Sequence, residues 1–221
     1  MRIWLFDIDG TLISSGGAGQ QSMADALHSA FGRPADTGQV PFSGRTDRSI
    51  AADLFAYHGI ENHPENWAIF VDHYLRALPA RLASLPGSVL PGVLEMLDWL
   101  SQQSDQQIGL LTGNIPRGAQ TKLRHFDLDH RFAFGFYGDR HFDRDDVARD
   151  AHADLVGRLG EPSGELDIWI VGDTPRDVRC GQIIGARTIA VATGNYSTAE
   201  LQACRPDVTV ETLSQLNFTA L

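Results

Sequence analysis

The sequence predicts an α/β fold, a Rossmann-like doubly wound parallel sheet interrupted by an inserted α-helical cap domain. Short apolar runs alternate with amphipathic segments over most of the 221 residues, a pattern typical of strands joined by crossover helices. Residues 16–88 break this pattern, because they contain only helix-like segments. We therefore expect an α/β core domain formed by residues 1–15 and 89–221, and a helical cap domain formed by residues 16–88.

Six apolar runs are expected to form the strands of the core. The first, Ile3–Phe6, is continuous rather than alternating, which is typical of a strand buried on both faces. The other runs are residues 107–112, 132–137, 166–171, 188–192 and 208–210. The core helices are expected from about residue 92 to 100 and over residues 116–125, 146–159 and 175–184.

The inserted segment contains three expected helices between two flexible crossings. The first covers Gln20–Phe31, the second runs to about His58 with Thr46 or Asp47 as its N-cap, and the third begins at Pro64. A glycine-rich stretch at residues 16–19 and a Pro/Gly-rich stretch at residues 86–91 lie at the two crossings. Both crossings are therefore candidate hinges.

Charge and cysteine content exclude several classes of partner. A formal net charge of -10 and a pI of about 5.1 argue against nucleic acid or an anionic membrane as the main partner. The N-terminus lacks the pattern of a signal peptide, and no apolar run approaches the length of a membrane span. Cys180 and Cys204 do not form a disulfide framework. We expect a cytoplasmic protein with reduced thiols, either monomeric or dimeric.

Polar residues cluster where three of the expected strands end. Asp7 and Asp9 follow the first strand, Thr112–Asn114 stand at the end of the second, and Asp173 and Asp177 follow the fourth. The carboxyl ends of parallel strands lie at one edge of a sheet, so these groups can converge. Hard oxygen donors of this kind suit Mg²⁺.

These clusters resemble the motifs of a known enzyme superfamily. Asp7-Ile8-Asp9-Gly10-Thr11-Leu12 resembles motif I of the haloacid dehalogenase superfamily, Leu110–Asn114 resembles motif II, and Gly172–Asp177 resembles motif IV. The helical insertion between motifs I and II is similar to the small C1-type cap of the phosphoglycolate phosphatase-like branch. The resemblance spans nearly the whole chain and implies a phosphatase with Mg²⁺ as cofactor and a small phosphorylated metabolite as substrate.

The resemblance also implies a role for each motif residue. Asp7 would attack phosphorus and form an aspartyl-phosphate, and Asp9 would act as acid and base with a raised pKa. Mg²⁺ would be bound by the Asp7 carboxylate, the Asp9 backbone carbonyl and Asp173, with Asp177 as a further ligand or a holder of bound water. Phosphoryl oxygens would be bound by Thr112, Gly113 and Asn114.

The motif III cation departs from the usual pattern of the superfamily. The only lysine of the chain, Lys122, comes too early and is interpreted as a solvated helix residue. Arg144 stands where the motif should fall, in a loop just before a helix, and is assigned this role. Arg140 and Arg149 are the alternatives.

Residues in the cap are expected to determine substrate choice. The loop Gly44-Arg45-Thr46 combines a turn, a cation and a hydroxyl, so Arg45 and Thr46 are candidate substrate-binding residues. Other functions compatible with the motifs are a phosphomutase of the β-phosphoglucomutase type, a haloacid dehalogenase and a non-catalytic binding protein. The presence of Asp9 argues against the dehalogenase, because those enzymes lack this second aspartate.

Overall fold

The computed structural model describes residues 1–159 and 166–218, and the structural statements that follow concern these residues. Six strands form one sheet in the order β5-β4-β1-β6-β7-β8, and every pairing is parallel. The strands are β1 (Arg2–Phe6), β4 (Gln106–Leu111), β5 (Phe134–Phe136), β6 (Asp167–Gly172), β7 (Arg187–Val191) and β8 (Val208–Val210). The predicted α/β fold is confirmed, and β1 lies in the middle of the sheet.

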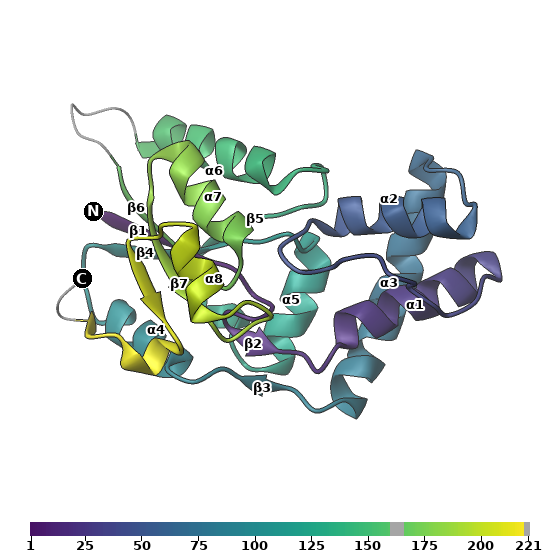
Figure 1. The fold of residues 1–221 in the computed structure, drawn as a ribbon, viewed down its shortest axis with the longest axis horizontal. Helices are drawn as coiled ribbons and strands as arrows, with labels where there is room; N and C mark the ends of the chain where they lie inside the picture. The colour runs from purple at the N-terminus through teal and green to yellow at the C-terminus, as the bar shows by residue number, and fades with distance from the viewer. Residues whose placement is uncertain (160–165, 219–221) are drawn as a thin grey trace.

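Helices cover both faces of the sheet. Along β1, Trp4 and Phe6 pack on one side with α4 and α5, whereas Ile3 and Leu5 pack on the other side with α6 and α7. Figure 1 shows the sheet between these two layers. This arrangement explains why the first strand is apolar at every position rather than alternating. The core helices are α4 (Val93–Ser101), α5 (Pro116–His125), α6 (Arg144–Leu159), α7 (Pro175–Ile184) and α8 (Thr198–Ala203).

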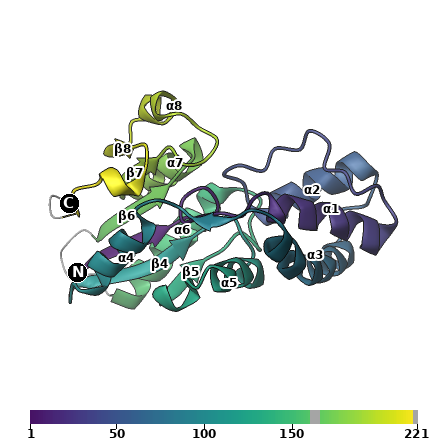
Figure 2. The ribbon, with the colours of Figure 1, turned by 90° about the horizontal axis from the view of Figure 1, so that it is seen from below.

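The inserted segment forms three helices with a hydrophobic cluster of their own. These are α1 (Ala18–Phe31), α2 (Asp47–His58) and α3 (Pro64–Ser84), and both views place them together beyond one end of the sheet (Figures 1 and 2). We call them the cap helices. Phe55 stacks edge-on against Phe31 and Phe70, which ties all three helices together. The core residue Ile115 packs into the same cluster and so connects the cap helices with the sheet.

The two crossings between the core and the cap helices are paired with each other. β2 (Ile13–Ser14) and β3 (Ser88–Val89) form a short antiparallel ribbon. This ribbon was not predicted, because it depends on pairing between segments that are far apart in the sequence. No helix among the described residues is long and apolar enough to cross a membrane.

One helix boundary bears directly on the site. The helix α6 begins at Arg144, two residues earlier than predicted, so Arg144 is in its first turn and not in the preceding loop. The side chain of Asp143 accepts a hydrogen bond from the Asp145 amide at 3.0 Å, as expected of a residue that precedes a helix. This start orients Arg144 toward the ends of the strands.

Candidate active site

The end of β1 places two aspartates at the carboxyl edge of the sheet. The Asp7 amide donates a hydrogen bond to the Val171 carbonyl at 3.0 Å, which keeps Asp7 in line with β6. Gly10 then adopts a φ of +87°, and any side chain at this position would collide with the Asp173 carboxylate. The sharp turn therefore lets both Asp7 and Asp9 line one cavity, as their spacing predicts.

This cavity has a volume of about 390 Å³ and lies between the carboxyl edge of the sheet and the cap helices. We call it the central cavity. Its wall contains these predicted site residues: Asp7, Asp9, Arg45, Gly113, Asn114, Arg144 and Asp173. Three further predicted residues are buried but do not line the wall: Thr46, Thr112 and Asp177. The predicted site residues thus lie around one cavity, although three of them do not line its wall.

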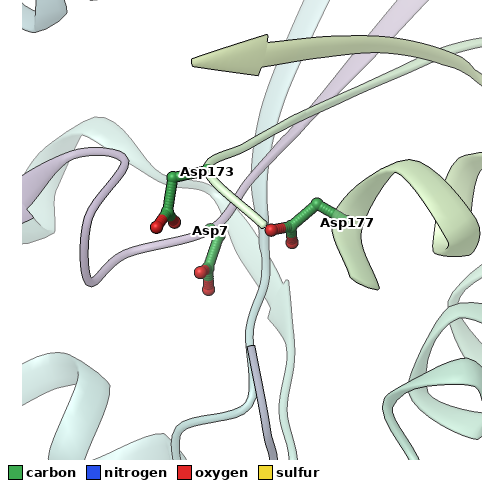
Figure 3. A group of neighbouring side chains, drawn as sticks. All are labelled: Asp7, Asp173 and Asp177. Atoms are coloured by element: carbon green, nitrogen blue, oxygen red, sulfur yellow. The ribbon is translucent and has the colours of Figure 1, made fainter. Parts of the chain in front are cut away.

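Three buried carboxylates form the centre of the site. Asp7, Asp173 and Asp177 come from the end of β1, the end of β6 and the first turn of α7, and each offers an oxygen within 4.8 Å of the others (Figure 3). The Thr11 hydroxyl donates to Asp173 Oδ1 at 3.0 Å. Asp177 Oδ2 accepts hydrogen bonds from the amide and hydroxyl of Thr174 at 2.9 and 2.7 Å, which fixes its side chain.

Arg144 is the cation of this cluster. Its Nη2 lies 3.0 Å from Asp7 Oδ1 and 2.5 Å from Asp177 Oδ1, and it donates to the Leu111 carbonyl at 3.1 Å. The alternatives considered from the sequence are exposed, with 86% of the Arg140 side chain and 55% of the Arg149 side chain accessible to solvent. Of these three arginines, only Arg144 lines the central cavity.

The cluster contains more carboxylates than cationic groups that could neutralise them. Burial raises the pKa of Asp7 to about 6, and the opposing effect of Arg144 is further offset by Asp177 and Asp9. Burial, together with the charges of Asp177 and Asp7, also raises the pKa of Asp173 well above its ordinary value. One guanidinium therefore does not balance three buried carboxylates. Excess negative charge on hard oxygen donors fits a divalent cation such as Mg²⁺.

Asp9 belongs to a second group of polar side chains, and this group includes Lys122. The Lys122 ammonium lies 2.5 Å from Asp9 Oδ2 and 2.6 Å from Asn114 Oδ1. The interpretation of Lys122 as a solvated helix residue is therefore wrong, because only 4% of the residue is exposed. On α5 it shares the buried stripe of Gly118, Ala119 and Leu123. That helical spacing was the signal in the sequence that could have revealed it.

The pKa of Asp9 is shifted in the direction opposite to the one expected. Burial alone would raise it, but the charge of Lys122 and the hydrogen bonds from Lys122, Asn114 and Ser15 lower it below its ordinary value. The expected raised pKa is therefore not present in this arrangement. Asp9 is held ionised, which suits a group that accepts a proton from water.

Thr112 and Asn114 organise the segment that follows β4. The Thr112 hydroxyl oxygen accepts hydrogen bonds from the Asn114 amide at 3.3 Å and from the Asn114 side chain at 2.9 Å. Because both of these bonds use the oxygen as acceptor, the hydroxyl proton remains able to donate to a further group. The side-chain amide of Asn114 also donates to Asp9 Oδ2 at 2.9 Å, so this segment is tied to β1.

The cap loop contacts the core at Gly113. A side chain at Gly113 would collide with the Arg45 carbonyl, and the Gly113 carbonyl accepts a hydrogen bond from the Asp47 amide at 2.7 Å. The Arg45 guanidinium lies 2.6 Å from Asp53 and also donates to two cap carbonyls. Thr46 is fully buried and caps α2 by accepting from the Ser49 amide at 3.1 Å. The structure thus gives Thr46 a capping role.

Asp47 and Tyr74 are among the cap residues that line the central cavity without having been predicted as site residues. Asp47 is the first residue of α2, and its Oδ2 accepts a hydrogen bond from the Ile115 amide at 2.8 Å. Burial raises its pKa to about 6, although Lys122 opposes this shift. Tyr74 of α3 is 1% exposed, and its hydroxyl has no hydrogen-bond partner among the described residues. In the sequence, Asp47 was considered as a possible N-cap and not as a site residue.

Comparison with known protein families identifies one match. Residues 4–191 match the family model described as "Haloacid dehalogenase-like hydrolase". This range includes both aspartates after β1, the segment after β4, Arg144 and the two acids after β6. Comparison with curated proteins gave no match.

Several solved structures share the fold over nearly their whole length. A predicted phosphoglycolate phosphatase from Haemophilus somnus 129PT has 18% sequence identity and a TM-score of 0.74, with 99% of this chain and 97% of that chain covered. CbbY from Rhodobacter sphaeroides in complex with phosphate has 16% identity and a TM-score of 0.75, with 97% and 96% covered. A predicted phosphatase from Clostridium acetobutylicum has 19% identity and a TM-score of 0.72, with 99% and 97% covered. These similarities establish a common fold.

Proposed function

Because the chain belongs to the haloacid dehalogenase-like hydrolase family, we propose that it hydrolyses small phosphomonoesters through an aspartyl-phosphate on Asp7. The observation that carries this proposal is the placement of Asp7 in the wall of the central cavity, within an acidic cluster and 3.0 Å from Arg144. A carboxylate in such a position can attack phosphorus, and a fixed cation can stabilise the negative charge that develops.

The proposed first step transfers the phosphoryl group to the enzyme. An Asp7 carboxylate oxygen forms a bond to phosphorus as the bond between phosphorus and the ester oxygen breaks. The leaving oxygen takes a proton from Asp9. A phosphate dianion next to Asp9 would add negative charge and raise the pKa of that carboxyl, which favours its protonated form. The Thr112 hydroxyl and the backbone around Gly113 and Asn114 would donate to phosphoryl oxygens.

The second step returns Asp7 to its initial state. Asp9, ionised after the first step, accepts a proton from water, and the water oxygen attacks phosphorus as its bond to Asp7 breaks. Inorganic phosphate then leaves. The ion pair with Lys122, at 2.5 Å, supports this role because it holds the Asp9 carboxylate in its ionised form.

The composition of the acidic cluster supports Mg²⁺ as the cofactor. Asp7, Asp173 and the backbone carbonyl of Asp9 would hold the ion, while Asp177 would orient Arg144 and bound water. Both Asp177 oxygens already have partners in Thr174 and Arg144, which favours this supporting role. When bound, the ion would neutralise charge on the phosphoryl oxygens and so lower the barrier to attack by an anionic nucleophile.

The proposal includes a cap that opens to admit substrate and closes to exclude water. The core would comprise residues 1–15 and 89–221, and the cap residues 16–88, with hinges near residues 16–19 and 86–91. The hydrophobic cluster that the cap helices form mainly among themselves supports this division. We further propose a cytoplasmic protein acting on a soluble phosphorylated metabolite, which agrees with the free thiols of Cys180 and Cys204.

A direct test is phosphate release from a panel of phosphate esters by the purified protein, with Mg²⁺ and with excess chelator. We expect release that depends on Mg²⁺ and on Asp7. Formation of an isomeric sugar phosphate without release of phosphate would instead indicate a phosphomutase. The absence of turnover with every ester would contradict the proposed function.

A further inference from the structure

The cationic side chains that line the central cavity are all paired with acidic side chains. Among the described residues, three cationic side chains line it: Arg45, Lys122 and Arg144. Each lies within ion-pair distance of a carboxylate: Arg45 is 2.6 Å from Asp53, Lys122 is 2.5 Å from Asp9, and Arg144 is 3.0 Å from Asp7. A second anionic group on a substrate would therefore find each of these three cations already paired with an acid.

Asp47 adds negative charge on the cap side of the cavity. Its side chain is buried in the seam between α2 and the start of α5, where Oδ2 accepts the 2.8 Å hydrogen bond from the Ile115 amide. Asp9 also lines the cavity, so acids are present on both its cap wall and its core wall. Among the described residues, four acids therefore line the cavity, namely Asp7, Asp9, Asp47 and Asp173, against the three cations. This excess of acidic groups would disfavour an anionic leaving group.

Tyr74 provides a neutral polar group in the same wall. Its side chain is 1% exposed and lines the cavity, and its hydroxyl has no partner among the described residues. A buried hydroxyl without a partner is uncommon, because the group loses its hydrogen bonds with water on burial. A ligand hydroxyl or carbonyl could supply the missing partner. Apolar side chains also line the cavity, namely Met23, Phe42 and Ile50.

From this combination we propose that the enzyme selects phosphomonoesters with an uncharged leaving group that carries a hydroxyl or carbonyl for Tyr74, and rejects leaving groups bearing a carboxylate or a second phosphate. This inference rests on the proposed phosphomonoester hydrolysis. It also favours hydrolysis over a mutase reaction, because a bisphosphate intermediate would place a second phosphate near Asp47. The proposal rests on the pairing of the three cations with acids and on the two cap residues Asp47 and Tyr74.

Two matched pairs of esters test this selectivity. The first pair is 2-hydroxyethyl phosphate and phosphoglycolate, which differ only by a hydroxymethyl group in place of a carboxylate. The second pair, glycerol 3-phosphate and 3-phosphoglycerate, differs in the same way. We expect kcat/KM to be higher for the uncharged member of each pair by at least about tenfold, since a like charge in a buried site is strongly unfavourable. A preference for the carboxylate member would overturn the proposal.

Two conservative variants connect the selectivity to the named residues. Asp47→Asn keeps an acceptor for the Ile115 amide but removes the charge, so it should raise kcat/KM for phosphoglycolate relative to 2-hydroxyethyl phosphate. Tyr74→Phe should lower kcat/KM for 2-hydroxyethyl phosphate but not for ethyl phosphate, which has no hydroxyl to bind. The matched controls are Asp72→Asn and Tyr57→Phe, because these half-exposed cap residues do not line the cavity.

The outcomes separate failure of the selectivity from failure of the reaction itself. If the protein hydrolyses none of these esters, and p-nitrophenyl phosphate is not hydrolysed either, both proposals are overturned together. If p-nitrophenyl phosphate is hydrolysed but Asp47→Asn and Tyr74→Phe leave the ester ratios unchanged, only the selectivity proposal is overturned. Thermal unfolding of each variant should confirm that it is folded.

Discussion

The Lys122 ammonium lies 2.5 Å from Asp9 Oδ2, so the only lysine of the chain is paired with the residue proposed to move protons during catalysis. The lysine side chain is 5% exposed, whereas that of Asp9 is 39% exposed. Removal of Lys122 would leave the partly accessible Asp9 carboxylate without its cation. The Asn114 side-chain oxygen would also lose the hydrogen bond that Lys122 donates to it. This pair therefore affects both stability and turnover.

We predict that Lys122→Met lowers kcat by about tenfold or more, because Asp9 loses the charge that keeps it ionised. The free energy of unfolding should fall by only about 1–2 kcal/mol, since water can reach Asp9 and screen its charge. Steady-state kinetics and denaturant unfolding measure the two effects. Arg124→Ala, an exposed change on the same helix, is the control and should alter stability by less than about 0.5 kcal/mol. Wild-type kcat in Lys122→Met would contradict this role.

A pH-dependent effect on stability is expected from Asp47. Its pKa is raised from 3.8 to about 6, mainly by burial. The folded state therefore holds this proton more tightly than the unfolded state, and the resulting stabilisation is complete below the unfolded pKa and lost as the pH rises through the folded pKa.

We predict that the unfolding free energy of the wild type, relative to Asp47→Asn, falls as the pH rises from about 4 to about 7. Denaturant unfolding at a series of pH values measures the difference, and Asp72→Asn controls for loss of an exposed carboxylate. A difference that stays constant or rises over this range would show that burial does not raise this pKa.

Activity should require Mg²⁺ and should be inhibited by Ca²⁺, which takes more ligands at longer distances and would disturb in-line attack. Mg²⁺ should also raise the Tm, because it neutralises the excess charge of the buried carboxylates. Asp173→Asn should reduce the increase in Tm. Activity assays and thermal unfolding, each with Mg²⁺ or chelator, measure these effects. Full activity in excess chelator would rule out a metal requirement.

The Arg144 guanidinium should stabilise the transition state. We predict that Arg144→Ala lowers kcat/KM by about 10²-fold, or roughly 3 kcal/mol, which is typical for loss of one donor to a developing charge. Arg149→Ala, an exposed change on the same helix, should be nearly silent. Both variants can be compared in one kinetic assay. An equal loss in the two variants would show that Arg144 has no special role.

Residues close together in the sequence gave most of the correct predictions. Apolar runs predicted the strands, and the strand ends predicted where Asp7, Asp173 and Asn114 lie. The N-cap of α2 was narrowed to two candidates, of which Thr46 is confirmed. The helix α8 was missed although Ser197 and Glu200 form a capping box at its start, because the helix has only 6 residues.

Contacts between distant segments could not be predicted in the same way. The pairing of Lys122 with Asp9 joins α5 to the turn after β1, and the approach of Asp47 to Ile115 depends on how the cap loop docks on Gly113. Sequence patterns predicted whether each segment is a helix or a strand, but not which distant side chains come into contact. Tyr74 packs in the hydrophobic cluster of the cap helices and also lines the cavity, and its helical spacing alone did not indicate the second contact.

The most direct test of the proposed reaction is the kcat of Asp7→Asn with the best ester found in the panel. An amide cannot attack phosphorus, whereas the change is nearly isosteric and removes a buried charge, so the protein should remain folded and be as stable as the wild type or more so. We predict a kcat below about one thousandth of the wild-type value. Asp127→Asn, at a side chain that is 98% exposed, is the matched control and should retain full activity. A kcat for folded Asp7→Asn within about tenfold of the wild-type value would contradict the assignment of Asp7 as the nucleophile.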